Sequence, residues 1–325
     1  MRTIRWGIIG CGEVTEVKSG PGFYKAPHSA LVAVMRRDAA KAADFARRHG
    51  VARSYGDAQQ LIDDPEVDAV YIATPTSSHL DYVLRVAAAG KPVYVEKPMG
   101  MDHAECQRMI AACRTAGVPL FVSLYRRALP RFLKVRELLE TGAIGTPRAV
   151  SISVLRPPSE ADRSGADNWR IDPAINGGGY FFDIAPHQVD LVDFLLGPVS
   201  SAWGRAGNQQ GLYKAEDIVS GGWVHANGVQ GTGLWSFGAD CSRDEIEIVG
   251  STGRLRFACF DNAPVELWRD GELVESFQID HPPHVHQPLI QTINAALNDI
   301  GTCPSTGESG ARAAWLMDKL VGREV

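Results

Sequence analysis

The sequence lacks several features that would point to particular classes of protein. Its six cysteines are scattered without a CxxC pair, a usage typical of the reducing cytosol. Residues 1–10 resemble a strand leading into a glycine turn rather than a signal peptide, and no apolar run approaches the roughly 20 residues of a membrane span. The formal net charge of −5 offers no basic face to nucleic acid. We therefore expect a soluble, cytoplasmic protein without membrane or nucleic-acid partners.

A regular alternation of short apolar runs and helical patterns fills residues 1–123. Glycines follow three helical stretches, at the position where a left-handed residue commonly ends a helix. These stretches are Ala39–His49, His79–Ala88 and Ala104–Ala116. The strand candidates are Ile4–Ile9, Ala30–Met35, Ala69–Ala73, Pro92–Val95 and Leu120–Ser123. The rhythm predicts βαβ units and a parallel, doubly wound sheet.

Residues 124–325 have a different pattern, and the length of the chain also favours two domains. Helical patterns occur at Pro130–Glu140, near Pro186–Leu196, at Gln287–Asn298 and at Gly310–Val321. The strand candidates are Thr146–Leu155, Ile218–His225, Val229–Phe237, Glu245–Val249, Arg254–Phe260 and Val265–Trp268. We predict a dinucleotide-binding domain over 1–123 and a sheet-rich catalytic domain over 124–325.

A glycine turn, Gly10-Cys11-Gly12, follows the first predicted strand. Thr15 stands where a dinucleotide fingerprint often has its third glycine or alanine. Such a turn brings backbone N–H groups at a helix start close to a pyrophosphate. An ordinary strand–helix turn is the alternative, but the position in the alternation favours a dinucleotide. We predict cofactor contacts at Gly10, Gly12, Glu13 and Val14.

The end of the second strand indicates which dinucleotide binds. An NAD site usually has an acidic residue there, which accepts hydrogen bonds from the ribose. Here Arg36 and Arg37 come first and Asp38 follows. Guanidinium groups suit a 2′-phosphate, so we predict NADP, with Arg36 as the main determinant. Two solvated surface arginines are the alternative, and Asp38 leaves NAD possible.

Two motifs carry candidate catalytic residues. Glu96-Lys97-Pro98 ends the fourth predicted strand, and ligands of open α/β sheets bind at that edge. Asp183 and His187 are four residues apart, so one helix would place them on the same face for acid–base work. The alternatives are a solvated lysine at a strand end, and Asp183 as a helix N-cap with Pro186 in the first turn.

Together these motifs resemble the glucose–fructose oxidoreductase / inositol dehydrogenase (Gfo/Idh/MocA) family over almost the whole chain. The joint pattern of Glu96-Lys97-Pro98 with a later triple glycine and an Asp-x₃-His spacing is specific. The other matching features are the Gly10/Gly12 turn, Ala73-Thr74-Pro75 with His79, Gly90-Lys91-Pro92-Val93, Gly142-Ala143-Ile144-Gly145, Trp169-Arg170 and Ser251-Thr252-Gly253.

The resemblance implies an N-terminal Rossmann domain followed by an α+β domain with a large, mostly antiparallel open sheet, used in homodimer or homotetramer contacts. It also implies hydride transfer between nicotinamide C4 and a secondary alcohol or ketone of a sugar, cyclitol or polyol. Lys97 and His187 are the implied proton-transfer residues, and Asp183 orients His187 or the substrate. The implied cofactor side has Thr74, Pro75, His79, Glu96 and Lys97, and the implied substrate side has Lys97, Arg126, Trp169, Arg170, Asp183 and His187.

Three features leave alternatives open. Ser19–Gly22 should interrupt the first helix and leave Phe23–Lys25 on a loop, either a pocket wall or plain surface. Arg126 or Arg127 would favour an anionic substrate, or form a salt bridge between domains. His281, His284 and His286 invite a metal assignment, but nothing nearby completes a zinc set, so we predict no metal and a loop at a contact.

The predicted function is therefore an oxidoreductase that prefers NADP and acts on sugars or polyols. Two alternatives remain. One is a regulator that binds dinucleotide without catalysis, and the retention of Lys97, Asp183 and His187 argues against it. The other is an NAD-type glycosidase that uses transient oxidation.

Overall fold

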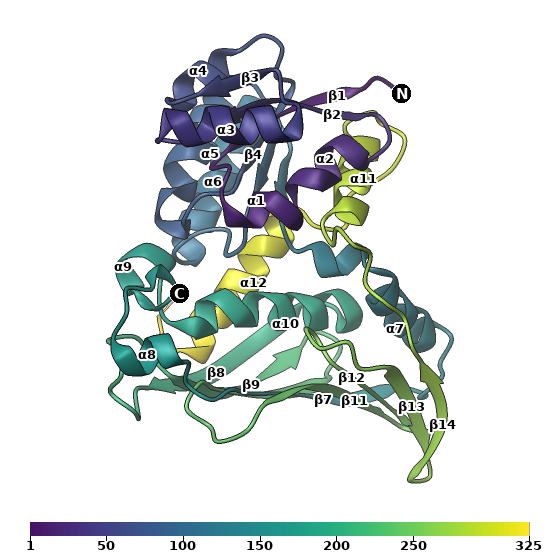
Figure 1. Ribbon diagram of the computed structural model, residues 1–325. Helices are drawn as coiled ribbons and strands as arrows, with labels where there is room; N and C mark the ends of the chain where they lie inside the picture. The colour runs from purple at the N-terminus through teal and green to yellow at the C-terminus, as the bar shows by residue number, and fades with distance from the viewer. Residues whose placement is uncertain (325) are drawn as a thin grey trace. The chain divides into compact units, whose positions relative to one another are not determined.

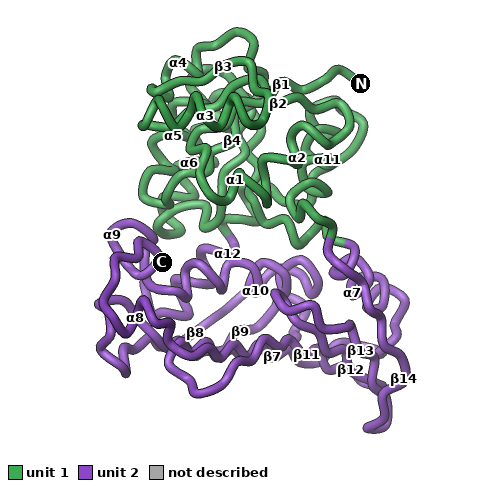
Figure 2. The backbone as a smooth tube through the Cα atoms, viewed as in Figure 1, with its two compact units in different colours: residues 1–129, 282–311 green, residues 130–281, 312–325 purple. Residues whose placement is uncertain are grey.

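The computed structural model describes residues 1–324, which form two compact units (Figure 2). Unit 1 comprises residues 1–129 and 282–311, and unit 2 comprises residues 130–281 and 312–325. The first segment of unit 1 ends at Leu129, close to the expected boundary at residue 123. The return of 282–311 to unit 1 is a difference from the expected single boundary, and packing within unit 1 explains it.

A six-stranded parallel sheet forms the centre of unit 1 (Figure 1). Its strand order, β3-β2-β1-β4-β5-β6, is the Rossmann order, so the predicted fold of this part is confirmed. The strands are β1 (Ile4–Ile9), β2 (Ser29–Met35), β3 (Arg53–Tyr55), β4 (Ala69–Ile72), β5 (Val93–Val95) and β6 (Leu120–Val122). The order reverses direction between β1 and β4, and their carboxyl ends are therefore where a dinucleotide is expected.

Helices α3 and α6 of unit 1 have the start and stop residues that their sequence indicates. Asp38 accepts a hydrogen bond from the Lys41 amide at the start of α3, and Gly50 ends that helix in the left-handed region. Asp102 and Gly117 do the same for α6. The helices are α1 (Glu13–Val17), α2 (Gly20–Lys25), α3 (Ala39–His49), α4 (Ala58–Asp63), α5 (His79–Ala88), α6 (His103–Ala116) and α11 (Gln287–Ala296).

The segment at Ser19–Gly22 corrects one expectation. The first helix is interrupted as predicted and ends at Val17, but Gly20–Lys25 forms helix α2 instead of a loop. Phe23 is fully buried, with its ring centroid 5.1 Å from those of Trp6 and Tyr71. Aromatic burial therefore outweighs the poor helix propensity of two glycines and a proline. Phe23 belongs to the core and forms no pocket wall.

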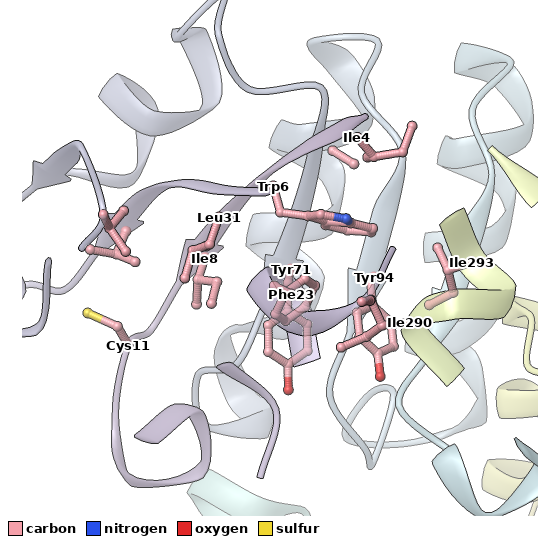
Figure 3. Packing of buried hydrophobic residues seen from close by; sticks show 14 of the residues in the cluster. Ile4, Trp6, Ile8, Cys11, Phe23, Leu31, Tyr71, Tyr94, Ile290 and Ile293 are labelled. Carbon is pink, nitrogen blue, oxygen red and sulfur yellow. The ribbon is translucent and has the colours of Figure 1, made fainter. Parts of the chain in front are cut away.

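The same core explains why residues 282–311 join unit 1. Helix α11 packs beside α2, and Ile290 and Ile293 lie in one apolar cluster with Trp6 and Phe23 (Figure 3). Trp6 Nε1 also donates a hydrogen bond to Asn294 Oδ1 at 3.1 Å. Side chains from the last quarter of the sequence thus complete the apolar core beside β1, the first strand of the chain.

An eight-stranded sheet forms unit 2, in the order β14-β13-β12-β11-β7-β10-β9-β8. Only β10 and β7 pair in parallel, so the expected mostly antiparallel sheet is confirmed. The strands are β7 (Pro147–Leu155), β8 (Val199–Gly207), β9 (Ile218–His225), β10 (Gln230–Ser236), β11 (Arg243–Gly250), β12 (Arg254–Phe257), β13 (Val265–Arg269) and β14 (Glu272–Phe277). No helix of residues 1–324 is long and apolar enough to cross a bilayer.

One long helix, α10, covers this sheet within unit 2 (Figure 1). The Phe181 and Trp235 rings meet edge to face at 5.1 Å, and Trp235 Nε1 donates to Gln188 Oε1 at 3.2 Å. Helix α10 comprises Tyr180–Leu196, and the unit also contains α7 (Pro130–Glu140), α8 (Glu160–Ser164) and α9 (Pro173–Asn176). Helix α12 (Gly307–Leu320) has its first five residues in unit 1 and the others in unit 2.

Candidate functional site

The glycine turn lies directly after β1, at the point where the sheet reverses its strand order. Gly10 has φ +94°, and its N–H donates to Met35 O at 2.9 Å. A Cβ there would lie 2.8 Å from Ala73 O, so the turn after β1 can approach the end of β4 only with glycine. A Cβ on Gly12 would instead meet only Gly10 O, at 3.8 Å. The open face of Gly12 fits the approach of a cofactor phosphate, beside the predicted contacts Glu13 and Val14.

The residues after β2 have separate roles. Arg36 is half-buried, and its guanidinium donates to Cys11 O in the glycine turn at 3.4 Å. Arg37 is exposed. Asp38 caps helix α3 by accepting the Lys41 amide, a bond that lowers the pKa of its carboxyl. The Arg36 guanidinium at the end of β2 therefore lies beside the glycine turn that is predicted to bind phosphate. The Asp38 carboxylate instead caps helix α3.

His79 connects two loops at the same edge of the sheet. Its Nδ1 lies 3.0 Å from Pro98 O, its Nε2 lies 2.8 Å from Thr74 O, and the side chain is buried. Burial lowers the pKa of His79, so the ring is neutral at physiological pH. His79 thus fixes the loop after β4 to the turn after β5. Pro75 is exposed beside it, and direct cofactor contacts of Thr74, Pro75 and His79 stay predictions.

Glu96 and Lys97 follow β5 and form the best-defined part of the candidate site in unit 1. The Lys97 N–H donates to Glu96 Oε2 at 3.1 Å, and the Tyr71 hydroxyl donates to Glu96 Oε1. The Glu96 residue is 8% exposed, whereas Lys97 is half-buried. A carboxylate held at both oxygens therefore supports the backbone that carries the lysine. This arrangement differs from a freely solvated lysine at a strand end.

A buried polar cluster continues behind Glu96, and the sequence did not indicate it. Tyr94 donates to Ser123 Oγ at 3.1 Å, and Ser123 Oγ lies 3.1 Å from His286 Nδ1. His286 is buried, with Nδ1 3.8 Å from Glu96 Oε1. Burial, together with the charges of nearby cations, lowers the pKa of His286 to about 3. A tyrosine in an apolar buried strand was the available signal, because its hydroxyl needs a partner.

Two of the three histidines near residue 284 have defined contacts within unit 1. His284 Nδ1 lies 2.9 Å from Val17 O and its Nε2 lies 2.7 Å from Lys25 Nζ. His286 packs its ring on Tyr125, with centroids 4.3 Å apart, and His281 belongs to unit 2. No group of three metal-binding side chains occurs among residues 1–324.

Arg126 is one of two buried arginines that follow β6. It is 5% exposed, and its guanidinium lies 5.0 Å from the centroid of the Tyr125 ring. Arg127 is equally buried and donates to Pro304 O at 3.2 Å. The polar residues after this strand are therefore packed within the fold. Contact of Arg126 with a substrate stays a prediction.

Asp183 and His187 both lie on α10, one helical turn apart. The helix begins at Tyr180 with Gly179 as its N-cap, so the alternative of Asp183 as the N-cap is wrong. The expected start near Pro186 was late, because the helix begins six residues earlier and continues through that proline despite its missing N–H and its bulky ring. His187 is 5% exposed and meets the Phe260 ring edge to face at 5.6 Å. The shared helical face of the two residues is confirmed.

The triple glycine positions the start of α10. The Gly179 N–H donates to Glu216 Oε1 at 2.7 Å, and a Cβ at Gly179 would lie 2.5 Å from Glu216 O. Burial raises the pKa of Glu216. The glycines therefore allow the helix start to pack against the segment before β9. Glu216 is a further residue that sequence reasoning missed.

Trp169 and Arg170 lie on a short helical turn near Asp183 of helix α10. Arg170 Nε is 3.5 Å from Asp183 Oδ2, and its guanidinium stacks 4.7 Å from the Trp169 ring. Asn176 Nδ2 donates to Arg170 O at 3.0 Å and holds this turn. Three of the predicted substrate residues thus meet within unit 2. Lys97 belongs to unit 1, and its approach to His187 stays a prediction.

These observations define a Rossmann-type dinucleotide-binding protein with a second unit built on an open sheet. A model of the oxidoreductase family with an NAD-binding Rossmann fold matches residues 4–124, and one of the Gfo/Idh/MocA C-terminal domain matches residues 132–256. The chain belongs to the Gfo/Idh/MocA oxidoreductase family, as its motifs indicated.

The chain is similar to proteins with names of their own. It is 41% identical to oxidoreductase P35 of Formosa agariphila over 98% of each chain. It is 28% identical to 1,5-anhydro-D-fructose reductase of Ensifer adhaerens, over 94% of this chain and 92% of that one. The fold matches a levoglucosan dehydrogenase solved with NADH and levoglucosan, with a TM-score of 0.85 and 23% identity, over 98% of this chain and 96% of that one.

Proposed function

We propose that this oxidoreductase transfers a hydride between nicotinamide C4 and a secondary alcohol or ketone of a sugar, cyclitol or related polyol. The observation that carries the proposal is the Lys97 backbone held by a buried Glu96 at the carboxyl end of β5. A relative named as an anhydrofructose reductase supports a sugar-like substrate. The proposal gives Lys97, Asp183 and His187 the catalytic roles.

The residues of unit 1 fit a nicotinamide dinucleotide. The open face of Gly12 leaves room for the pyrophosphate, and Arg36 beside the turn supplies a cation for a 2′-phosphate. Because Asp38 is engaged as a helix cap, we favour NADP over NAD. When bound, the nicotinamide supplies or accepts the hydride, and the protein's own residues handle the proton.

His187 is our candidate for the acid–base residue at the substrate hydroxyl. Asp183, one turn earlier on α10, would orient it or bind the substrate, with Arg170 3.5 Å from that carboxylate. The Lys97 ammonium would polarise the same oxygen and position it. The exchanged assignment, with Lys97 as the base, uses the same atoms.

A single-turnover experiment tests this function. Protein in excess over NADPH or NADH is mixed with a panel of keto-sugars, and the nicotinamide absorbance is followed. We expect loss of absorbance with at least one ketone, faster with NADPH. Tight dinucleotide binding without oxidation by any ketone would favour a regulator. Cleavage of a glycoside with no net change in the cofactor would favour the glycosidase alternative.

We also propose a homodimer or homotetramer that forms through the sheet of unit 2. Strand β10 alternates buried and exposed residues, so one face of the sheet packs under α10 and the other is open. Trp203 on β8 is 59% exposed and Leu234 on β10 is 38% exposed. Exposed apolar side chains of this size support an interface between copies.

A further inference from the structure

A buried tyrosine lies behind the candidate catalytic lysine, outside the residues considered so far for chemistry. Tyr71 comes from β4, 25 positions before Glu96, and its side chain is fully buried. Its ring stacks on Tyr94 with centroids 4.7 Å apart and lies 5.1 Å from Phe23. Figure 3 shows the Tyr71 and Tyr94 rings side by side, with their hydroxyl oxygens on the same side. The aromatic packing thus fixes the direction of the Tyr71 hydroxyl.

The Tyr71 hydroxyl acts as a donor to Glu96. Burial first, and the negative charge of Glu96 second, raise the pKa of Tyr71 well above its ordinary value. The phenol is therefore protonated throughout the working pH range and donates to Oε1. Hydrogen bonds to a charged acceptor are stronger than neutral ones, so this contact restricts the carboxylate firmly.

The second carboxylate oxygen connects this bond to the lysine. Oε2 accepts the Lys97 N–H at 3.1 Å, so the two oxygens join β4 to the turn after β5. On the other side of that turn, His79 Nδ1 lies 3.0 Å from Pro98 O. The backbone around Lys97 is therefore supported from two directions. On the Glu96 side, the support begins at the Tyr71 hydroxyl.

We infer that Tyr71 is a positioning residue for the reaction, acting through Glu96 to place the backbone of Lys97. The inference rests on the proposed function for its kinetic consequence. Tyr71 touches neither substrate nor cofactor in this scheme. Its hydroxyl orients Glu96, and Glu96 fixes the start of the side chain that polarises the substrate oxygen.

The test uses Tyr71→Phe, which removes one oxygen and keeps the aromatic ring in the core. A matched control is Tyr55→Phe. Tyr55 lies on a different strand, β3, and its hydroxyl also donates to a carboxylate, Asp64 Oδ2, at 3.1 Å. We expect Tyr71→Phe to lower kcat by about 10- to 100-fold with little change in KM, the effect of a small misplacement of a catalytic group. Tyr55→Phe should keep the wild-type kcat.

A double-mutant cycle with Glu96→Ala separates positioning from a general loss of stability. If Tyr71 acts through Glu96, adding Tyr71→Phe to Glu96→Ala should change kcat less than twofold, because the shared contact is already lost. Fully multiplicative effects of the two substitutions on kcat would overturn the inference. Equal kcat values in wild type and Tyr71→Phe would do so as well.

A second readout needs neither substrate nor cofactor. Hydrogen–deuterium exchange of the Lys97 amide in the free protein should accelerate at least tenfold in Tyr71→Phe and in Glu96→Ala, and remain unchanged in Tyr55→Phe. An unchanged Lys97 amide in Tyr71→Phe would contradict the inference even if kcat falls. If the wild type oxidises no cofactor with any ketone, the proposed function fails, while the exchange experiment still decides the link from Tyr71 to Lys97.

Discussion

The backbone N–H of Lys97 donates to the side chain of Glu96, the residue before it, at 3.1 Å. A lysine that merely ends a strand does not need such a bond to a buried carboxylate. The bond holds the start of the Lys97 side chain at the carboxyl edge of the parallel sheet, where open α/β folds bind their ligands. The position of Lys97 at this edge is the structural basis for the catalytic predictions.

Lys97→Met should remove the proposed polarising charge while keeping the length of the side chain. We expect kcat to fall by about 10²- to 10⁴-fold, the usual contribution of a general acid or base, with dinucleotide affinity nearly unchanged. His187→Asn should give a loss of similar size. Stopped-flow absorbance gives the rate and quenching of protein fluorescence gives the affinity. Lys134→Met, which changes an exposed pair with Glu137, is the control. Normal turnover in Lys97→Met would exclude the assigned role.

Arg36→Asp should reverse or strongly reduce the preference for NADP. The guanidinium beside Cys11 O would be replaced by a carboxylate, which repels a 2′-phosphate and can accept hydrogen bonds from a ribose. The measurement is the ratio of kcat/KM for NADPH and NADH. Arg47→Asp on helix α3, where Arg47 pairs with Asp44 at the surface, controls for net charge. The same ratio in wild type and Arg36→Asp would eliminate Arg36 as the determinant.

Sequence patterns predicted most of unit 1 because its elements carry their own local signals. Strand β1 and helices α3 and α5 have the predicted bounds, and these segments combine apolar patterning with clear end signals. Strand β3 was missed because Arg53–Tyr55 is short, lies at the sheet edge and lacks a buried apolar face. Strand β14, at the edge of the other sheet, was missed for the same reason, since five of its six residues are exposed.

The candidate site was predictable only where its residues are close in sequence. The spacing of Asp183 and His187 predicted a common helical face without any knowledge of the fold. The bond from Tyr71 to Glu96 joins β4 to the turn after β5, and the cluster at His286 needs a segment 190 positions away from Glu96. Such contacts depend on tertiary packing and leave no periodic signal. Helix α2 formed against its propensity for the same reason, because Phe23 enters a core built from other strands.

Phe23→Ala should destabilise unit 1 substantially. The ring is fully buried between Trp6 and Tyr71, and its removal leaves a cavity in an aromatic cluster. We expect the free energy of unfolding to fall by about 3–5 kcal/mol, measured by urea denaturation. Tyr24→Ala, at a neighbouring position that is 40% exposed, should change it by about 0.5 kcal/mol or less. Similar effects of the two substitutions would mean that Phe23 lies on a surface loop after all.

Trp203→Glu should weaken self-association if copies pair through the sheet of unit 2. A carboxylate at a residue that is 59% exposed is harmless in a monomer, but it is costly once buried in an apolar interface. Sedimentation velocity at micromolar concentration should show a smaller species for the variant than for the wild type. Val17→Glu, at a 62% exposed position of unit 1, should leave the assembly intact. A wild type that is already monomeric would rule out the proposed oligomer.

Glu16 should make stability depend on acid pH. Its carboxylate accepts hydrogen bonds from Arg48, at 2.6 and 2.8 Å, and lies 2.8 Å from His49 Nε2. The bonds from Arg48, followed by the contact with His49, lower the pKa of Glu16 from 4.5 to about 2.

Because the pKa of Glu16 is lower in the folded protein than in the unfolded chain, its contribution to stability is complete above pH 4.5 and is lost as the pH falls toward 2. Glu16→Gln should therefore destabilise the protein at pH 7 and do so progressively less between pH 4.5 and pH 3. Urea denaturation of both proteins at each pH measures this difference. Glu13→Gln, at an exposed position on the same helix, should give a small difference that does not change with pH. A Glu16→Gln effect of constant size from pH 7 to pH 3 would show that the carboxylate does not bind Arg48 in the folded protein.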